Sequence, residues 1–201
     1  MKIGKETIPR TSISTSDEDT IVVRGLDLCA DLIGKISFTD YFHLLVVGKR
    51  PTPAATAVLD ATLVAIAEHG LVPSVQASRM TFAAAPDALQ GAVAAGILGC
   101  GSVILGASEN AGRMFCEIDE KAGADGDLDA AALAVLKAYR ASGKPIPGYG
   151  HPLHKARDPR VDALFEVARV NGAGRRYVNI AEAVERVIAD ATGKHLKLNV
   201  S

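Results

Sequence analysis

The sequence of 201 residues contains no tryptophan, and only 4% of its residues are aromatic. Its formal net charge is −1, because 22 lysines and arginines are balanced by 23 aspartates and glutamates. A nucleic-acid-binding surface needs an excess of positive charge, and sites for single strands also use aromatic rings to stack bases. The composition therefore argues against nucleic acid as a partner.

Cysteine is also scarce. Cys29, Cys100 and Cys116 are far apart and form no Cys-x-x-Cys pair. An odd, dispersed set argues against a disulfide framework or a structural zinc site, and it fits a reducing compartment. The first residues, MKIGKETIPRTSIS, lack the apolar stretch that is typical of a signal peptide. We therefore expect a cytoplasmic protein.

Charged residues are absent from Ala88 to Ser108, a length that could cross a membrane. The run is flanked by Asp87 and Glu109 rather than by basic residues, and it has no aromatic belt. Its five glycines mean that its side chains are small rather than strongly apolar. We therefore reject a membrane span and expect a central helix from Ala88 to Leu105, buried on all sides against its symmetry mate in a homodimer.

What the sequence does contain is 48% hydrophobic residues, enough to build a core without disulfides. Residues Thr11 to Val23 carry β-branched residues on both sides of Asp17-Glu18-Asp19, a pattern that predicts a short extended or hairpin segment and the only strand-like region. Residues 123–126 are expected to form a flexible linker. Apolar periodicity and capping residues predict helices over 28–33, 38–47, 53 to near 70, 128–140, 161–170 and 177–191.

The stretch from Lys144 to Arg160 contains four prolines and two glycines, so it cannot be a helix or a strand. A shaped loop would aim the imidazole of His151, while Lys155, Arg157 and Arg160 supply positive charge nearby. This combination suits an anionic ligand that carries a carbonyl group, because cations pair with carboxylates and an imidazole donates to the carbonyl oxygen. A surface turn with solvated basic residues is the alternative, and the residues alone leave both open.

The tetrapeptide Gly148-Tyr149-Gly150-His151, followed by Lys155 and Asp158-Pro159-Arg160, closely resembles the G-[FY]-G-H-x-x-x-K-x-x-D-P-R signature of the citrate synthase family. Citryl-CoA lyases share the fold of this family. The resemblance implies an all-α protein with minor β structure at the N-terminus. It also implies a large helical domain over residues 1–112, a small helical domain over 113–195, and a return to a large domain at 196–201 that is incomplete at its C-terminus.

The resemblance implies that an oxoacid such as oxaloacetate binds to His69, His151 and Arg160. His69 lies in the segment EHGLVPS, where the family has D-H-x-x-x-x-S, although a histidine at a helix end can also serve as a capping cation. Coenzyme A is implied as a cosubstrate rather than a permanently bound cofactor. Its implied contacts are Pro147, Gly148, Tyr149, Gly150 and Lys155.

The residues for proton transfer do not match the family. The family motif G-P-L-H-G-G-A-N aligns with residues 102–109 and places Leu105 at the histidine, while P-N-V-D aligns with residues 198–201 and places Ser201 at the carboxylate. Neither side chain can act as a general acid or base at neutral pH. Glu109 is the candidate substitute, and a solvated acidic residue at a helix end is the simpler interpretation of it. The His151-x-x-His154 spacing lacks a third ligand, so we expect no metal site.

Two functions follow from the resemblance. One is a carbon–carbon lyase or acyltransferase that acts on citryl-CoA or on acetyl-CoA plus oxaloacetate, with citryl-CoA cleavage favoured. The other is a non-catalytic homologue that binds the oxoacid and coenzyme A as a sensor or partner subunit. Because the sequence ends within the pattern of the family, we expect a fragment or a reduced homologue, and favour a fragment.

Overall fold

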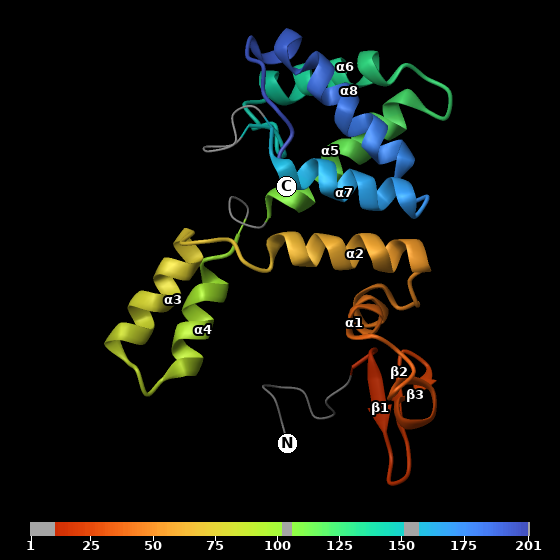
Figure 1. Ribbon diagram of the computed structural model, residues 1–201, viewed down its shortest axis with the longest axis vertical. Coiled ribbons are helices and arrows are strands. Elements are labelled where there is room, and N and C mark those ends of the chain that lie inside the picture. Colours follow the sequence, from red (N-terminus) through yellow and green to blue (C-terminus); the bar gives the residue numbers. More distant parts are fainter. Residues whose placement is uncertain (1–10, 102–105, 151–156, 201) are drawn as a thin grey trace. The chain divides into compact units, whose positions relative to one another are not determined.

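The structure is a computed structural model that describes residues 11–101, 106–150 and 157–200 (Figure 1). Most of these residues are helical, which confirms the all-α fold with a small N-terminal sheet. The chain divides into two compact units, residues 1–60 and 61–201, which we describe separately. The domain boundary at residues 112 and 113 stays a prediction. No helix in the described part of the chain is long and apolar enough to cross a membrane.

The N-terminal unit begins with an antiparallel sheet in the order β1-β2-β3, formed by Ser14–Ser16, Ile21–Val23 and Leu26–Asp27. The side chain of Asp17 accepts hydrogen bonds from the backbone of Asp19 and Thr20, at 3.0 and 2.8 Å, and closes the predicted hairpin. The third strand was not predicted. It forms because Arg24 and Gly25, with φ of 50° and 80°, reverse the chain in only two residues.

After the sheet, the single turn η1 (Leu28–Leu32) and the helix α1 (Phe38–Val47) follow as predicted, with Asp27 and Ser37 as their N-caps. Helix α2 (Pro53–Ile66) ends before the expected boundary near residue 70. Thr39 donates a hydrogen bond to Asp60, and Thr56 donates to Asp40 at 2.5 Å, so α1 is fastened to the first turns of α2.

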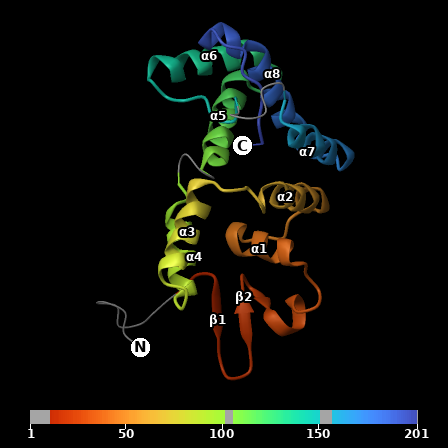
Figure 2. The ribbon, with the colours of Figure 1, turned by 60° about the vertical axis from the view of Figure 1, so that its left-hand side comes forward.

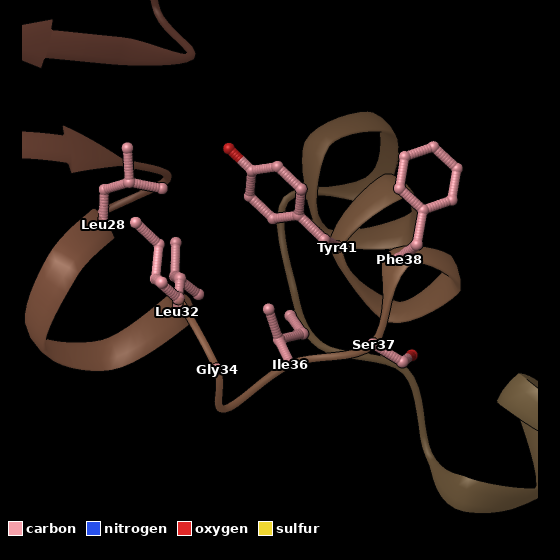
Figure 3. A pocket seen from close by; sticks show the side chains of 8 residues that line it. Leu28, Leu32, Gly34, Ile36, Ser37, Phe38 and Tyr41 are labelled. Atoms are coloured by element: carbon pink, nitrogen blue, oxygen red, sulfur yellow. The ribbon is translucent and has the colours of Figure 1, made fainter.

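A cavity of about 280 Å³ lies in this N-terminal unit (Figure 3). Leu28 and Leu32 line one side, and Ile36, Phe38 and Tyr41 line the other. None of the residues that line it carries a charge, so this cavity does not suit an anionic oxoacid.

Helices α3 (Pro73–Ala84) and α4 (Leu89–Leu98) form a hairpin and lie side by side in both ribbon views (Figures 1 and 2). They approach closely because Gly96 and Gly99 face α3: a Cβ on Gly99 would lie 2.9 Å from the Cα of Ser74.

The expected single helix from Ala88 to Leu105 is wrong. Helix α4 ends at Leu98, residues 99–101 are not helical, and the next helix begins at Ala107. Glycine has a low helix propensity, and Gly99 and Gly101 follow each other closely at this point. Leu89, Val93, Ile97 and Leu98 are exposed in the single chain, so the expected burial on all sides stays a prediction that requires a partner chain.

The remaining helices are α5 (Ala107–Ala122), α6 (Leu128–Ala141), α7 (Pro159–Val170) and α8 (Arg175–Thr192). Asp127 and Asp158 cap α6 and α7, and the boundaries of α6, α7 and α8 agree with the prediction to within two residues. Helix α6 packs against α5 and α8. The core of this group consists of fully buried apolar side chains, among them Met114, Ile118, Leu136, Ile180, Val184 and Ile188.

Candidate active site

The predicted loop is anchored by the C-terminal segment. Tyr149 and Leu198 form an antiparallel bridge. The backbone N–H of Gly150 donates to the carbonyl of Lys197 at 2.7 Å, and that of Asn199 donates to the carbonyl of Gly148 at 2.9 Å. Gly148 and Gly150 have φ of 82° and 84°, values that glycine adopts without the strain of a Cβ atom. The two glycines therefore allow the backbone of residues 148–150 to pair with that of residues 197–199.

The side chain of Tyr149 is buried and bonded to α8. The residue is 7% exposed, and its hydroxyl donates to the carbonyl of Ala181 in α8 at 2.7 Å. Burial, assisted by the negative charge of Glu185, raises the pKa of Tyr149, so the phenol stays neutral and keeps donating. Tyr149 can therefore offer a ligand its backbone but not its hydroxyl.

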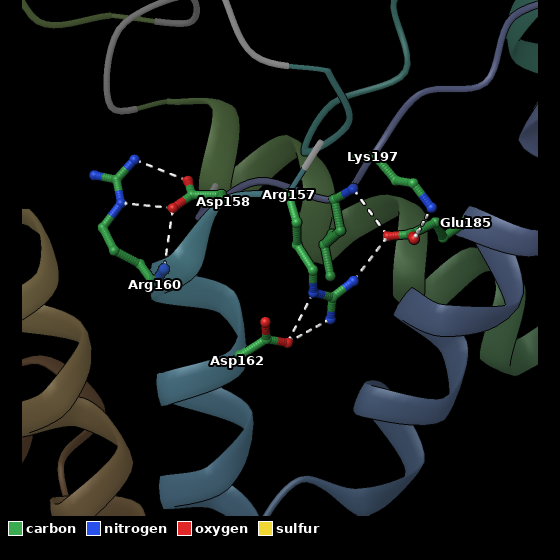
Figure 4. Close-up of polar contacts among 7 residues, drawn as sticks. Arg157, Asp158, Arg160, Asp162, Glu185 and Lys197 are labelled. Atoms are coloured by element: carbon green, nitrogen blue, oxygen red, sulfur yellow. Dashed lines mark hydrogen bonds and ion pairs between the residues drawn. The ribbon is translucent and has the colours of Figure 1, made fainter. Parts of the chain in front are cut away.

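Asp158 and Arg160 form an ion pair at the start of α7 (Figure 4). Asp158 is fully buried and accepts from the Nε and Nη2 atoms of Arg160 at 3.0 and 2.8 Å, and from the backbone N–H of Val200 at 3.2 Å. Burial alone would raise the pKa of Asp158, but the hydrogen bonds from Arg160 and Val200 outweigh it and lower the pKa to about 2. Asp158 is therefore ionised at neutral pH, and it fixes a guanidinium group whose side chain is 27% exposed.

A second set of charged residues lies beside this pair (Figure 4). Arg157 contacts Asp162 at 2.7 Å and Glu185 at 3.5 Å, and Glu185 also contacts the Nζ atom of Lys197 at 2.9 Å. Glu185 in addition accepts a hydrogen bond from the backbone N–H of Leu198 at 3.0 Å. Arg157 was predicted from the sequence to supply positive charge for a ligand. In the structure it forms ion pairs with acidic residues of α7 and α8.

The remaining predicted residues are placed as follows. His69 is exposed in the segment after α2, where the neighbouring Glu68 accepts from the backbone N–H of Gly70 at 2.8 Å. Glu109 is exposed in the first turn of α5 and forms an ion pair with Arg113 at 2.6 Å. No hydrogen bond or ion pair between described residues joins Arg160 to His69 or Glu109. The predictions for Leu105, His151, His154, Lys155 and Ser201 concern residues outside the described ranges.

A cavity of about 520 Å³ lies next to Pro147 and is bordered by Asn110 and Arg113 of α5, Tyr139 of α6, and Lys144. The Nζ atom of Lys144 is 5.1 Å from the centre of the Tyr139 ring, a cation–π distance. The hydroxyl of Tyr139 donates to Glu117 at 3.0 Å, and burial together with this carboxylate raises the pKa of Tyr139 to about 12. A flat apolar wall beside two cations suits a ligand that combines a ring with anionic groups. No cluster of potential metal ligands occurs in the described ranges.

The roles of Asp158 and Glu185 were missed from the sequence. Asp158 belongs to the signature, and an aspartate directly before Pro159 is a recognisable helix cap. The sequence therefore indicated its capping contact with the backbone of α7. Glu185 gave no signal, because its contacts with Lys197 and Leu198 join residues that only the folded chain brings together.

Comparisons with known proteins identify the family of this chain. Residues 37–201 match the family described as citrate synthase, C-terminal domain. The citrate synthase of Synechocystis sp. is 29% identical over 165 residues, which are 80% of this chain and 39% of that protein. The chain therefore spans about two fifths of the length of the curated citrate synthases that it matches.

Two solved structures are similar over nearly the whole chain. The citryl-CoA lyase of Hydrogenobacter thermophilus superposes with a TM-score of 0.82 at 35% identity, over 96% of this chain and 72% of that one. The ATP citrate lyase of Methanothrix soehngenii, in complex with citrate and coenzyme A, gives 0.79 at 25% identity, over 98% of this chain and 31% of that one. With the family match covering residues 37–201, these findings show that the chain belongs to the citrate synthase family.

Proposed function

We propose that this chain carries the oxoacid and acyl-CoA sites of a carbon–carbon lyase of the citrate synthase type, with cleavage of citryl-CoA to acetyl-CoA and oxaloacetate as the favoured reaction. The observation that carries the proposal is the partly exposed guanidinium of Arg160, which Asp158 fixes through two hydrogen bonds. The similarity to the Hydrogenobacter citryl-CoA lyase over 96% of the chain supports the choice of reaction. We place the protein in the cytoplasm and residues 113–195 in its small domain.

Arg160 is suited to the oxoacid because its orientation is set before a ligand arrives. Asp158 binds its Nε and Nη2 atoms, which leaves the Nη1 edge without a hydrogen bond among the described residues. A carboxylate of the oxoacid that reaches this edge gains a charge-assisted hydrogen bond without the cost of ordering a long side chain. His69 and His151 are the proposed donors to the remaining oxygens, and His151 polarises the carbonyl.

Coenzyme A is proposed to bind along Pro147 to Gly150, with Lys155 as a further cation. The cavity beside Pro147 supports this assignment, because Arg113 and Lys144 could pair with phosphate groups and Tyr139 offers a ring surface. Coenzyme A is a cosubstrate in this proposal, and the site needs no permanently bound cofactor.

Proton transfer distinguishes an enzyme from a binding protein. Cleavage of citryl-CoA releases the enolate of acetyl-CoA, which must be stabilised and protonated at carbon. Glu109 is the proposed acid, because Asn110 and Arg113 from the same helix border the cavity. The ion pair between Glu109 and Arg113, both well exposed, favours the second candidate, a non-catalytic sensor or partner subunit that binds the same ligands.

A homodimer is proposed as well, with the α3–α4 hairpin as its contact surface. Leu89, Val93, Ile97 and Leu98 of α4 and Met80 of α3 expose 51–85% of their surface in the single chain. A short hairpin with several large apolar side chains exposed is uncommon on isolated proteins, and a symmetric partner is the usual cover.

Calorimetry of the full chain with oxaloacetate and with coenzyme A tests the binding proposal. Arg160→Ala should weaken oxaloacetate binding roughly ten- to a hundredfold, the loss of one charge-assisted pair. Arg169→Ala is the matched control, since Arg169 lies on the same helix and contacts only Glu166 in the described structure. A wild-type chain that binds neither ligand would rule out the proposal.

Turnover assays in both directions then separate the two functions. Loss of a general acid typically lowers the rate by roughly 10²–10⁴, so Glu109→Gln should lower turnover by this factor if Glu109 donates the proton. Ligand binding without turnover would favour the sensor or partner subunit, while turnover unaffected by the substitution would exclude Glu109 as the acid.

A further inference from the structure

The C-terminal segment 197–200 is bonded along both of its edges. In an extended chain, successive backbone N–H groups point to opposite sides. On one side, the carbonyl of Lys197 and the N–H of Asn199 pair with Gly150 and Gly148. On the other side, the N–H groups of Leu198 and Val200 have no neighbouring strand and donate instead to two carboxylates, those of Glu185 and Asp158.

Both carboxylates also form ion pairs with cationic side chains (Figure 4). Glu185 projects from α8 and contacts Lys197 and Arg157. Asp158 caps the N-terminus of α7, where the helix dipole also favours a negative charge, and it binds Arg160 through two parallel hydrogen bonds. The acceptors are therefore fixed in place, and their charge strengthens the bonds from the backbone.

We propose that Asp158 and Glu185 are positioning residues that take the place of a missing strand and hold residues 197–200 against the loop at residues 148–150. The consequence for the ligand site rests on the proposed function. In that function, the two carboxylates keep the segments that directly precede His151 and Ser201 in the sequence paired with each other. Neither carboxylate needs to touch the substrate.

Asp158 has a second consequence, because its Oδ2 atom accepts from both Arg160 and Val200. An oxoacid that binds to Arg160 reduces the remaining motion of the guanidinium and of the Asp158 carboxylate that is bonded to it. The hydrogen bond from the amide of Val200 to this carboxylate is thereby strengthened. Ligand binding and the order of the C-terminal segment are thus coupled through one oxygen atom. Glu185 has no contact with Arg160 among the described hydrogen bonds and ion pairs, so it should affect the segment without this direct coupling.

The test measures amide hydrogen exchange by NMR in the full chain, together with oxaloacetate affinity by calorimetry. The variants are Asp158→Asn and Glu185→Gln, which keep the shape and remove the charge. Glu166→Gln is the control, because this carboxylate is exposed on α7 and contacts only Arg169. Asp158→Asn should speed exchange at Val200 at least tenfold and weaken oxaloacetate binding by a similar factor. Glu185→Gln should speed exchange at Leu198, and Glu166→Gln should change neither.

Saturating oxaloacetate should slow exchange at Val200 in the wild-type chain, and Asp158→Asn should abolish this response. Unchanged exchange at Val200 in Asp158→Asn, or faster exchange with full oxaloacetate affinity, would overturn the inference. If Asp158→Asn does not fold, the exchange rate of Leu198 in Glu185→Gln decides in its place. A wild-type chain that fails to bind oxaloacetate removes the proposed function, while the exchange rates of the variants still decide whether the two carboxylates hold the segment.

Discussion

The helices α5 to α8 and the α3–α4 hairpin differ in the solvent exposure of their large apolar side chains. In the first group, Met114, Leu136, Ile180 and Ile188 are at most 1% exposed. In the hairpin, Met80, Leu89, Ile97 and Leu98 are 62–85% exposed, and the helices meet through glycine and serine instead. The first group completes its core within this chain. The hairpin has a close internal contact and an outer surface on which these apolar side chains stay exposed in the described structure.

The sequence patterns of the two regions explain this difference. Helix α8 carries Ile180, Val184 and Ile188 at spacings of four on one face and charged residues on the other, so its buried face was predictable. Helix α4, with the sequence LQGAVAAGIL, has no charged residue and no polar face to mark what should be exposed. Its environment depends on what packs against it.

The largest expected effect lies in the completed core. Leu136→Ala should lower the free energy of unfolding by ~2–5 kcal/mol, because it removes buried methyl groups and leaves a cavity. Val93→Ala in the exposed face of α4 should cost less than ~1 kcal/mol in the monomer. Urea unfolding followed by circular dichroism measures both values. Equal losses would show that the hairpin has a core of its own and that the contrast between the regions is false.

A charge on the hairpin should disrupt the proposed homodimer. Ile97→Asp should weaken self-association roughly a hundredfold, since two symmetry-related charges would enter an apolar contact. Val170→Asp is the matched control on α7, because Ile97 and Val170 are both 67% exposed. Light scattering over a concentration series measures the association. If only Val170→Asp dissociates the dimer, the contact surface lies on α7 and not on the hairpin.

Asp158 makes the stability of the α5–α8 region depend on pH. Its pKa of about 2 lies below the ordinary value of 3.8, so the ionised form stabilises the fold above pH 3.8 and this contribution disappears as the pH falls toward 2. The shift corresponds to about 2 kcal/mol. The difference in unfolding free energy between wild type and Asp158→Asn should therefore shrink between pH 5 and pH 2. A difference that stays constant over this range would contradict the ionised, paired state.

The same residue shows how far the sequence could predict the site. The glycines, the helix caps and the loop were predictable because each depends on neighbours in the sequence: Asp158 caps α7, and Gly148 and Gly150 allow a positive φ. The contacts of Asp158 with Val200 and of Glu185 with Leu198 cross 42 and 13 positions. No local pattern encodes such a contact. The turn at Arg24 and Gly25 that creates β3 is local and was missed for a different reason, since an arginine at positive φ is uncommon.

Within the hairpin, the close contact between α3 and α4 should be sensitive to a single methyl group. The Cβ atom added by Gly99→Ala would lie 2.9 Å from the Cα of Ser74, a backbone atom that can move only if the helix moves. We expect a loss of at least ~1 kcal/mol, as for other overpacked sites. Gly101→Ala is the control, because its Cβ would meet nothing within 4 Å. Amide exchange in α4 reports the effect, and unchanged protection in Gly99→Ala would mean that the helices are not in close contact in solution.

The smallest expected effect has the opposite sign and lies in α5. Gly112 is exposed in the interior of this helix, and a Cβ there would meet nothing within 4 Å. Alanine restricts the unfolded chain and favours the helix, so Gly112→Ala should raise the free energy of unfolding by ~0.5–1 kcal/mol. Urea unfolding of the two chains side by side measures the gain. A loss of stability, accompanied by a lower mass in light scattering, would show that a partner approaches α5 closely at Gly112. In that event the α5–α8 region would also depend on a second chain, and its core alone would not account for its stability.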